Sequence, residues 1–115
     1  MIVTKIERQR RHPDRVNVYL DGVFAFGLDE EVLARHGLRK GDAIDEPTRA
    51  ILLGAEAVSR ARSRALRFLG YRLRSEREVR TKLAQAAFPE TVIEEAIAQI
   101  GRLGLIDDQI GRAHV

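Results

Sequence analysis

Residues 65–83 read ALRFLGYRLRSEREVRTKL, and this stretch contains the end of one helix and the start of the next. Gly70 is a natural end for the first helix, because glycine readily adopts the left-handed conformation that terminates helices. Ser75 and Glu78 have the S-x-x-E spacing of a capping box, in which two side chains satisfy free N–H groups at a helix start. The stretch therefore predicts two helices joined by a short turn.

The helix before this turn is long. Asp45 is suited to its N-cap, and Pro47 fits its first turn, where a missing N–H costs nothing. Gly54 is a candidate kink or break within it. Apolar residues then recur at steps of three or four, which predicts one buried face. They are Ile51, Ala55, Val58, Ala61, Ala65 and Phe68.

Two further helices are expected after the turn. The buried face of the first consists of Val79, Leu83 and Ala86. Pro89 starts the second, and Gly104 ends it. Its apolar stripe consists of Ile93, Ala96, Ile97, Ile100 and Leu103. Asp107 is suited to the N-cap of one more helix, which the chain barely enters.

Toward the N-terminus the apolar period changes to two, which is typical of strands. Residues 2–7 alternate in this way. Residues 16–20 and 23–27 are two β-prone runs separated by Asp21-Gly22, the strongest short-range signal for a hairpin with a type I′ turn. In this hairpin Leu20 faces Val23, Tyr19 faces Phe24, and Val18 faces Ala25. A short helix over 29–36, ended by Gly37, is expected to cover part of the resulting three-stranded meander.

The change of period near residue 45 predicts an α+β fold. Residues 1–45 form an N-terminal β-meander with a short helix, and residues 46–115 form a three-helix, helix-turn-helix-like repeat with the start of a next helix. Of the 115 residues, 44% are apolar and 32% charged, as in folded proteins. We find no apolar run of the roughly 20 residues that a membrane helix needs, no signal-peptide core and no cysteine. We expect a cytoplasmic protein.

No group of residues in the sequence is suited to catalysis. The three histidines, His12, His36 and His114, lie far apart and have no metal-ligand spacing. The serines have no histidine near them in sequence, and neither of the glycine-rich phosphate-binding motifs occurs. We therefore expect a protein that is not an enzyme and that has no cofactor and no metal site.

One feature of the charge distribution stands out. The chain carries a net charge of only +3, but nine basic and two acidic residues lie between Arg60 and Lys82. Helical spacing places several of these arginines away from the predicted core face. The candidate binding residues are Arg60, Arg64, Arg67, Arg72, Arg74, Arg77 and Arg80. Such a surface suits nucleic-acid phosphates or an acidic protein partner.

Residues 65–83 also match the pattern A-L-x-x-L-x-x-R-x-R-S-x-x-E-V-x-x-K-L, and in this they resemble the RecX family, regulators of the RecA recombinase. Residues 93–108 resemble the third helix of that family and the Asp-Asp junction after it. Residues 18–26 and 37–41 resemble the β-rich N-terminal extension of its longer members. The sequence departs from the family at Ile110-Gly111, where an aromatic-Ala pair is usual.

The resemblance implies a function. RecX proteins are built of tandem three-helix units that lie in the groove of a filament of RecA on single-stranded DNA. They modulate the ATPase, strand-exchange and coprotease activities of RecA, and no catalysis is implied. The expected partners are therefore the RecA filament and the single-stranded DNA within it, with no membrane. Members usually continue through two more repeats, so we expect this one-repeat sequence to be truncated.

Two other functions fit the sequence. The helices could form a direct DNA binder in which the basic face meets duplex phosphates, and binding to bare DNA would then depend steeply on salt. The chain could also be a non-catalytic interaction module that docks through its β-rich half. Exchange of several arginines for glutamate separates the second alternative from a filament regulator, because only the regulator depends on those arginines.

Overall fold

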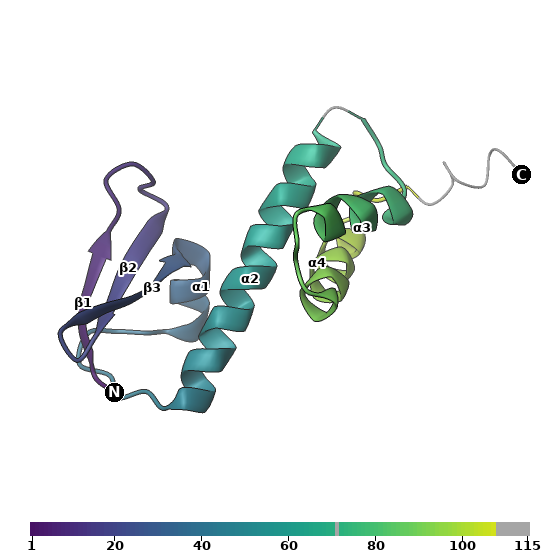
Figure 1. Ribbon diagram of the computed structural model, residues 1–115. Helices are drawn as coiled ribbons and strands as arrows, with labels where there is room; N and C mark the ends of the chain where they lie inside the picture. The colour runs from purple at the N-terminus through teal and green to yellow at the C-terminus, as the bar shows by residue number, and fades with distance from the viewer. Residues whose placement is uncertain (71, 108–115) are drawn as a thin grey trace, which may run out of the picture. The chain divides into compact units, whose positions relative to one another are not determined.

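The computed structural model describes residues 1–70 and 72–107, and its elements follow the predicted order (Figure 1). The strands are β1 (Val3–Arg8), β2 (Arg15–Leu20) and β3 (Val23–Asp29). The helices are α1 (Glu30–His36), α2 (Glu46–Leu69), α3 (Glu76–Gln85) and α4 (Glu90–Arg102). The α+β class is therefore confirmed.

The chain divides into two compact units, Met1–Glu56 and Ala57–Val115. Helix α2 begins in the first unit and ends in the second, so the predicted boundary at residue 45 precedes this division by the first turns of α2. Among the residues described, no helix combines the length and apolar character needed to cross a bilayer.

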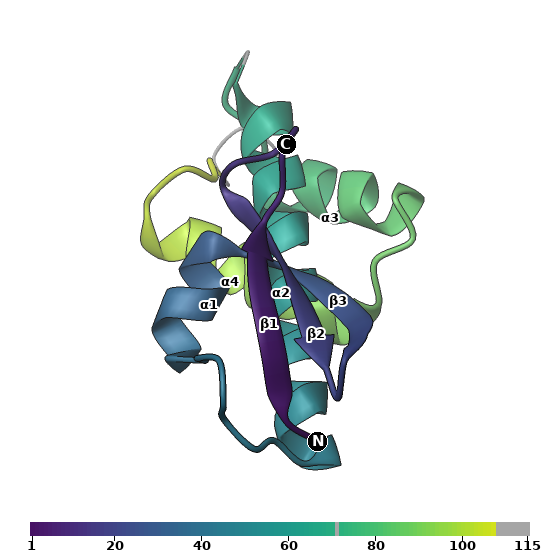
Figure 2. The same ribbon diagram turned by 90° about the vertical axis from the view of Figure 1, so that its left-hand side faces the viewer.

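The three strands form an antiparallel sheet in the order β1-β2-β3, and they lie side by side in Figure 2. Asp21 and Gly22 both have positive φ, 51° and 84°, as a type I′ turn requires. The predicted pairs Leu20–Val23 and Tyr19–Phe24 are confirmed.

The next predicted pair of the hairpin is wrong. Val18 faces Phe26 instead of Ala25, because the register shifts beside Tyr19 and β3 contributes one extra residue there. The shift places Phe26 among the buried residues and leaves Phe24 54% exposed.

The core of the first unit lies on one face of this sheet. It contains Val3, Val16, Val18, Leu20, Phe26, Leu28, Val32, Leu38, Ile44 and Leu52. Helix α1 begins at its N-cap Asp29 and ends at Gly37 in the left-handed conformation, as predicted. Helix α2 begins as predicted too, since the Asp45 side chain accepts a hydrogen bond of 2.8 Å from the Thr48 N–H. It continues through Gly54 without a break.

The apolar stripe predicted along α2 is wrong at its first position. Ile51 is 60% exposed, whereas Leu52 is buried. The physical reason is that α2 serves two cores, one with the sheet and one with the later helices. A stripe extended backward from Ala61 and Ala65 therefore does not predict which side chain near residue 51 is buried.

The second unit buries one apolar face of each of its helices. Its core contains Ala61, Ala65, Val79, Leu83, Val92, Ile93, Ala96, Ile97 and Ile100. The capping box of Ser75 and Glu78 is present at the start of α3. Leu103, predicted to be buried, is 64% exposed. The reason is that α4 ends at Arg102 and the chain turns away at Gly104, which has a φ of 73°.

The chain after α4 returns to the segment before α3. Ile106 forms a parallel bridge with Arg74, and the Asp107 N–H donates to the Arg74 carbonyl at 2.9 Å. This pairing fixes the backbone of Arg74 between two helices. The helix predicted after Asp107, including Ile110-Gly111, lies outside the described residues.

Candidate functional site

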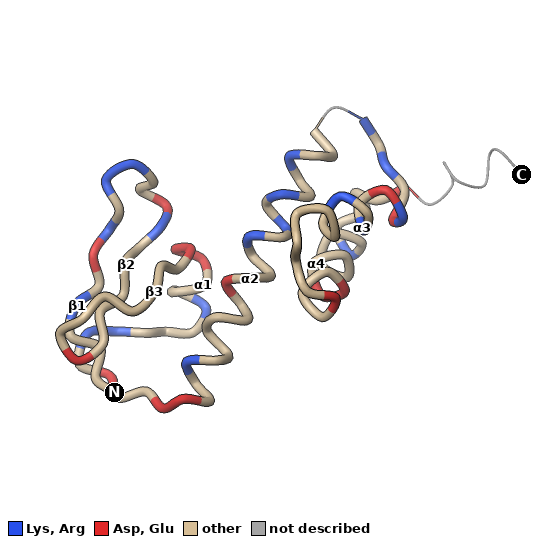
Figure 3. Tube along the Cα trace, in the orientation of Figure 1, with Lys and Arg blue, Asp and Glu red and all other residues tan. Residues whose placement is uncertain are grey.

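All seven candidate arginines belong to the second unit, and the structure distributes them over three of its segments. Figure 3 shows Lys and Arg along the later part of α2, in the segment before α3, and on α3 itself. Arg60, Arg64 and Arg67 lie on α2, Arg72 and Arg74 precede α3, and Arg77 and Arg80 lie on α3. Their surroundings differ enough to divide them into three groups.

The first group consists of exposed arginines whose charge is available to bind an anion. Arg60, Arg64, Arg67 and Arg77 are exposed, and none of them forms an ion pair with another described residue. The three on α2 recur at steps of four and three residues, so they share one side of the helix. These guanidinium groups have five N–H donors each with which to bind an anion.

The second group surrounds Glu78. Its carboxylate lies 3.0 Å from Arg72 Nη2 and 3.5 Å from Arg74 Nη1. The pKa of Glu78 lies below its ordinary value because the carboxylate accepts a hydrogen bond from the Ser75 N–H and because the two arginines add positive charge. One acidic group therefore caps α3 and partly neutralises two of the candidate cations.

Arg74 is the least exposed of these candidates. Its side chain is 18% exposed, and its guanidinium carbon lies 4.0 Å from the centre of the Phe68 ring. Lys82 Nζ lies 5.4 Å from the centre of the same ring. A cation near an aromatic face is attracted by the negative charge on that face. The Nε of Arg74 is buried and has no hydrogen-bond partner among the described residues.

The third group is Arg80 alone, which is surrounded by acidic side chains. Its guanidinium contacts Glu94, and it lies 3.0 Å from Glu90 and 3.9 Å from Glu76. The hydrogen bond from Arg80 lowers the pKa of Glu94, and the same contact raises the pKa of Arg80. The sequence predicted Arg80 as a binding residue, but the structure places it against the acidic start of α4. Its charge is therefore used to hold α3 and α4 together.

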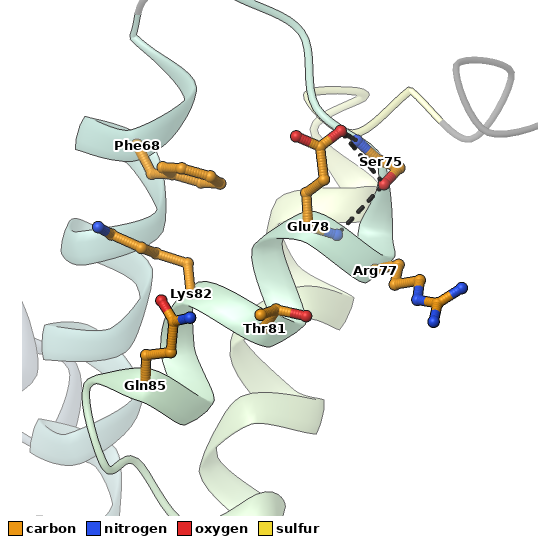
Figure 4. Close-up of a pocket in the computed structure, with 7 residues that line it drawn as sticks. All are labelled: Phe68, Ser75, Arg77, Glu78, Thr81, Lys82 and Gln85. Atoms are coloured by element: carbon orange, nitrogen blue, oxygen red, sulfur yellow. Dashed lines mark hydrogen bonds between the residues drawn. The ribbon is translucent and has the colours of Figure 1, made fainter.

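Two hollows lie between the end of α2 and α3. One, of about 300 Å³, is lined by Arg64, Arg67, Phe68, Arg74 and Lys82. The other, of about 400 Å³, is lined by Phe68, Ser75, Arg77, Glu78, Thr81, Lys82 and Gln85 (Figure 4). In that view the Phe68 ring and the Lys82 side chain lie between the two helices, whereas Arg77 points away from them.

Phe68 and Lys82 belong to the site, although neither is among the binding residues predicted from the sequence. Phe68 was assigned to the core stripe of α2, and it does pack against the core of the second unit. Lys82 was counted in the positive charge of residues 60–82 but was not singled out. Only the packing of α2 against α3 places both beside Arg64, Arg67 and Arg74.

The described residues contain no group of three His, Cys, Asp or Glu side chains that could hold a metal ion. His12 and His36 are both exposed, and His114 lies outside the described residues. What the second unit offers chemically is therefore a set of cations with hydrogen-bond donors, which is suited to binding anions.

Comparison with known proteins gives one consistent result for both units. Residues 1–45 match the family model described as the regulatory protein RecX N-terminal domain, and residues 61–99 match the first three-helix domain of RecX. These two matches cover most of the chain, one in each compact unit.

Individual relatives agree with the family models. The regulatory protein RecX of Levilactobacillus brevis is 42% identical over 107 residues, which are 93% of this chain and 40% of the relative. That of Clostridium acetobutylicum is 36% identical over 92% of this chain and 50% of the relative. A crystal structure of a regulatory protein RecX superposes with a TM-score of 0.82 at 35% identity, over 98% of this chain and 55% of that one.

The chain spans about half the length of the relatives that it matches, or somewhat less. The agreement extends from the sheet to the last described helix, and the matched solved structure has the same fold. By its sequence and its fold, this chain belongs to the RecX family of regulatory proteins.

Proposed function

We propose that this chain regulates the RecA recombinase by binding the filament that RecA forms on single-stranded DNA. In this proposal it modulates the ATPase, strand-exchange and coprotease activities of RecA, is not itself an enzyme, and works in the cytoplasm. The relatives are named regulatory proteins, which supports a regulatory role. The observation that carries the proposal is the group of exposed arginines without an acidic partner among the described residues of the three-helix unit.

The physical basis is electrostatic. A filament on single-stranded DNA presents phosphate groups and acidic protein side chains. Arg60, Arg64 and Arg67 offer a row of guanidinium groups that form charge-assisted hydrogen bonds with such oxygens. Complementary charge also accelerates the encounter, and this effect weakens as salt is added. Arg72, Arg74 and Arg77 extend the same positive region, while Arg80 contributes through the fold.

The curated relatives are longer than the part of them that this chain matches. The chain matches 40–50% of the length of the curated relatives, so these relatives contain further sequence outside the match. When several linked units bind one filament, every contact after the first is intramolecular. The whole protein then binds more tightly than any single unit does. We therefore expect this chain alone to act at higher concentrations than its longer relatives.

The test is the rate of ATP hydrolysis by RecA on single-stranded DNA, titrated with this chain. Binding of the chain to the same DNA without RecA is measured in parallel. We expect a dose-dependent change in the rate at concentrations that leave the bare DNA unbound. A change that appears only once the DNA itself is bound would instead support the direct DNA binder, and an unchanged rate would contradict the proposal.

A matched pair of variants locates the effect. The first carries Arg60→Gln, Arg64→Gln and Arg67→Gln. The second removes three exposed arginines of the first unit instead, with Arg10→Gln, Arg11→Gln and Arg39→Gln. Both lose the same charge, but we expect only the first to lose the effect on RecA. The opposite result would favour an interaction module that docks through the β-rich half.

A further inference from the structure

The smaller hollow of the second unit gathers four cations that are separate in the sequence. Arg64 and Arg67 come from α2, Arg74 from the segment before α3, and Lys82 from α3. Phe68 lies among them, and the residues that line the hollow include no carboxylate. Its volume of about 300 Å³ is at the small end of the range for ligand sites.

Most of this charge is not neutralised by the protein. Arg64, Arg67 and Lys82 pair with no carboxylate among the described residues. Arg74 shares Glu78 with Arg72.

These cations are held by other contacts. Arg74 and Lys82 lie near the Phe68 ring, at 4.0 and 5.4 Å from its centre. A cation held against an aromatic face can still donate its N–H groups in hydrogen bonds to an anion. Because like charges gathered in this way repel one another, an anion in the hollow relieves the repulsion.

We propose that this hollow binds the phosphate backbone of single-stranded nucleic acid, with its cations shared among neighbouring phosphates. Proteins that bind single strands use a positively charged groove that follows the backbone, and four cations line this hollow. The guanidinium groups of Arg64 and Arg67 can each present two parallel donors to phosphate oxygens. This assignment deepens the proposed function and rests on it for its biological meaning, but it can be tested on this chain without RecA.

The arrangement favours a phosphate chain over an acidic protein side chain. A single carboxylate neutralises one of the four cations, whereas a nucleic-acid strand carries a negative charge on every nucleotide. Arg60 lies one helical turn before Arg64 on α2 and extends the row beyond the hollow, where the next phosphate of a strand would lie. The hollow and the row together fit a polymer of regularly spaced anions.

The test compares two pairs of substitutions that remove the same charge. One chain carries Arg64→Gln and Arg67→Gln, which lie in the hollow. The control carries Arg11→Gln and Arg39→Gln, which are exposed and lie in the first unit, away from the hollow. Glutamine keeps the helix propensity close to that of arginine, and circular dichroism shows whether each variant is folded.

Binding is measured by fluorescence anisotropy with a labelled oligothymidylate of about 15 nucleotides, a length within the site sizes of single-strand binders, over a range of salt concentrations. Loss of two phosphate contacts reduces the slope of log K against log salt by about 1.4, which corresponds to about 25-fold weaker binding at about 0.1 M salt. We expect this loss in the Arg64/Arg67 variant and an unchanged slope in the control.

Lys82→Gln tests whether the strand binds in the hollow or only along the row of arginines on α2. Lys82 is on the other helix and reaches this region only through the packing of α2 and α3. The proposal predicts that Lys82→Gln reduces the salt slope by about 0.7 and weakens binding about fivefold at about 0.1 M salt. A folded Lys82→Gln variant that binds the oligonucleotide like the unmodified chain would overturn the hollow as the site.

The remaining outcomes are decisive too. Equal losses in the Arg64/Arg67 variant and the control would mean that only net charge matters, and would overturn the proposal. So would an unmodified chain that ignores the oligonucleotide but binds a polyglutamate peptide through Arg64 and Arg67. If binding of the oligonucleotide depends on the hollow but the chain does not change the ATPase rate of RecA, the phosphate site is supported and the proposed function is contradicted. If the chain changes the ATPase rate but does not bind the oligonucleotide, the proposed function is supported and the phosphate site is contradicted.

Discussion

The guanidinium of Arg80 on α3 contacts the carboxylate of Glu94 on α4, across the packed faces of the two helices. Glu90, one turn earlier on α4, lies 3.0 Å from the same guanidinium, and Glu76 on α3 lies 3.9 Å away. One cation is thus shared by three carboxylates. Without it, these carboxylates would repel one another at the start of both helices.

Arg80→Gln should therefore destabilise the second unit. The ion pairs are partly solvent-exposed, and isolated surface pairs contribute little. Here one substitution removes three attractions and leaves the acidic groups facing each other, so we expect a loss of about 1 kcal/mol in the free energy of unfolding. Denaturant titration followed by circular dichroism measures it. Arg77→Gln is the control, because Arg77 is exposed on the same helix and has no ion pair with another described residue; an equal loss there would contradict the explanation.

The same contact makes stability depend on pH. The hydrogen bond from Arg80 holds the pKa of Glu94 below its ordinary value of 4.5. A carboxyl group with a lowered pKa in the folded chain binds its proton more readily when the chain unfolds. Its contribution is therefore complete above about pH 4.5 and is lost as the pH falls through the lowered pKa.

We therefore expect the difference in melting temperature between the unmodified chain and Arg80→Gln to shrink between about pH 7 and about pH 3. The measurement is a series of thermal melts of both chains at matched ionic strength, since salt also screens the pair. A difference that stays constant over this range would show that Arg80 acts by packing and not by its ion pairs.

Ser75→Ala tests the capping box. The Ser75 side chain accepts a hydrogen bond of 3.2 Å from the Glu78 N–H, and removal of an N-cap side chain costs about 1 kcal/mol. We expect this loss of stability in a denaturant titration. Ser63→Ala is the matched control, because Ser63 is an exposed serine within α2, where alanine is the better helix former. If Ser75→Ala is as stable as Ser63→Ala, the box does not stabilise α3.

The sequence was sufficient for those parts of the fold that local chemistry determines. Asp21-Gly22 specified the turn, Asp45 and Ser75 specified two helix starts, and Gly37 specified a helix end. These features depend on a few adjacent residues. The extra residue of β3 was not predictable in the same way, because a bulge reflects how Phe26 reaches the core while the turn stays fixed.

The candidate site shows the same limit. The sequence identified the positive region, and four of its arginines are exposed and lack an acidic partner among the described residues. Two of the three acidic partners of Arg80 come from α4, ten and more residues away, and depend on how α3 packs against it. The grouping of Lys82 with Phe68 likewise depends on packing. Charge counts along a chain do not show which charges the fold itself neutralises.

Substitution of Gly22 and of Gly54 by alanine should change the stability of the chain in opposite directions. The two variants together test the hairpin and α2. Gly22 has a φ of 84°, a conformation that an L-residue adopts only at a cost, so Gly22→Ala should destabilise the first unit by about 1 kcal/mol. Gly54 lies within α2, and an added methyl group there would meet no atom within 4 Å. Gly54→Ala should therefore stabilise the chain by about 1 kcal/mol, because alanine favours the helix more than glycine does.

Denaturant titration of both variants beside the unmodified chain measures the two effects. Opposite signs would support a left-handed turn residue at Gly22 and a continuous helix through Gly54. If Gly54→Ala were destabilising, α2 would need the freedom of glycine at that position, as in a helix with a break between the two units. If Gly22→Ala were neutral, the type I′ turn would not fix the register of the hairpin, and the pairing of Tyr19 with Phe24 would have to do so instead.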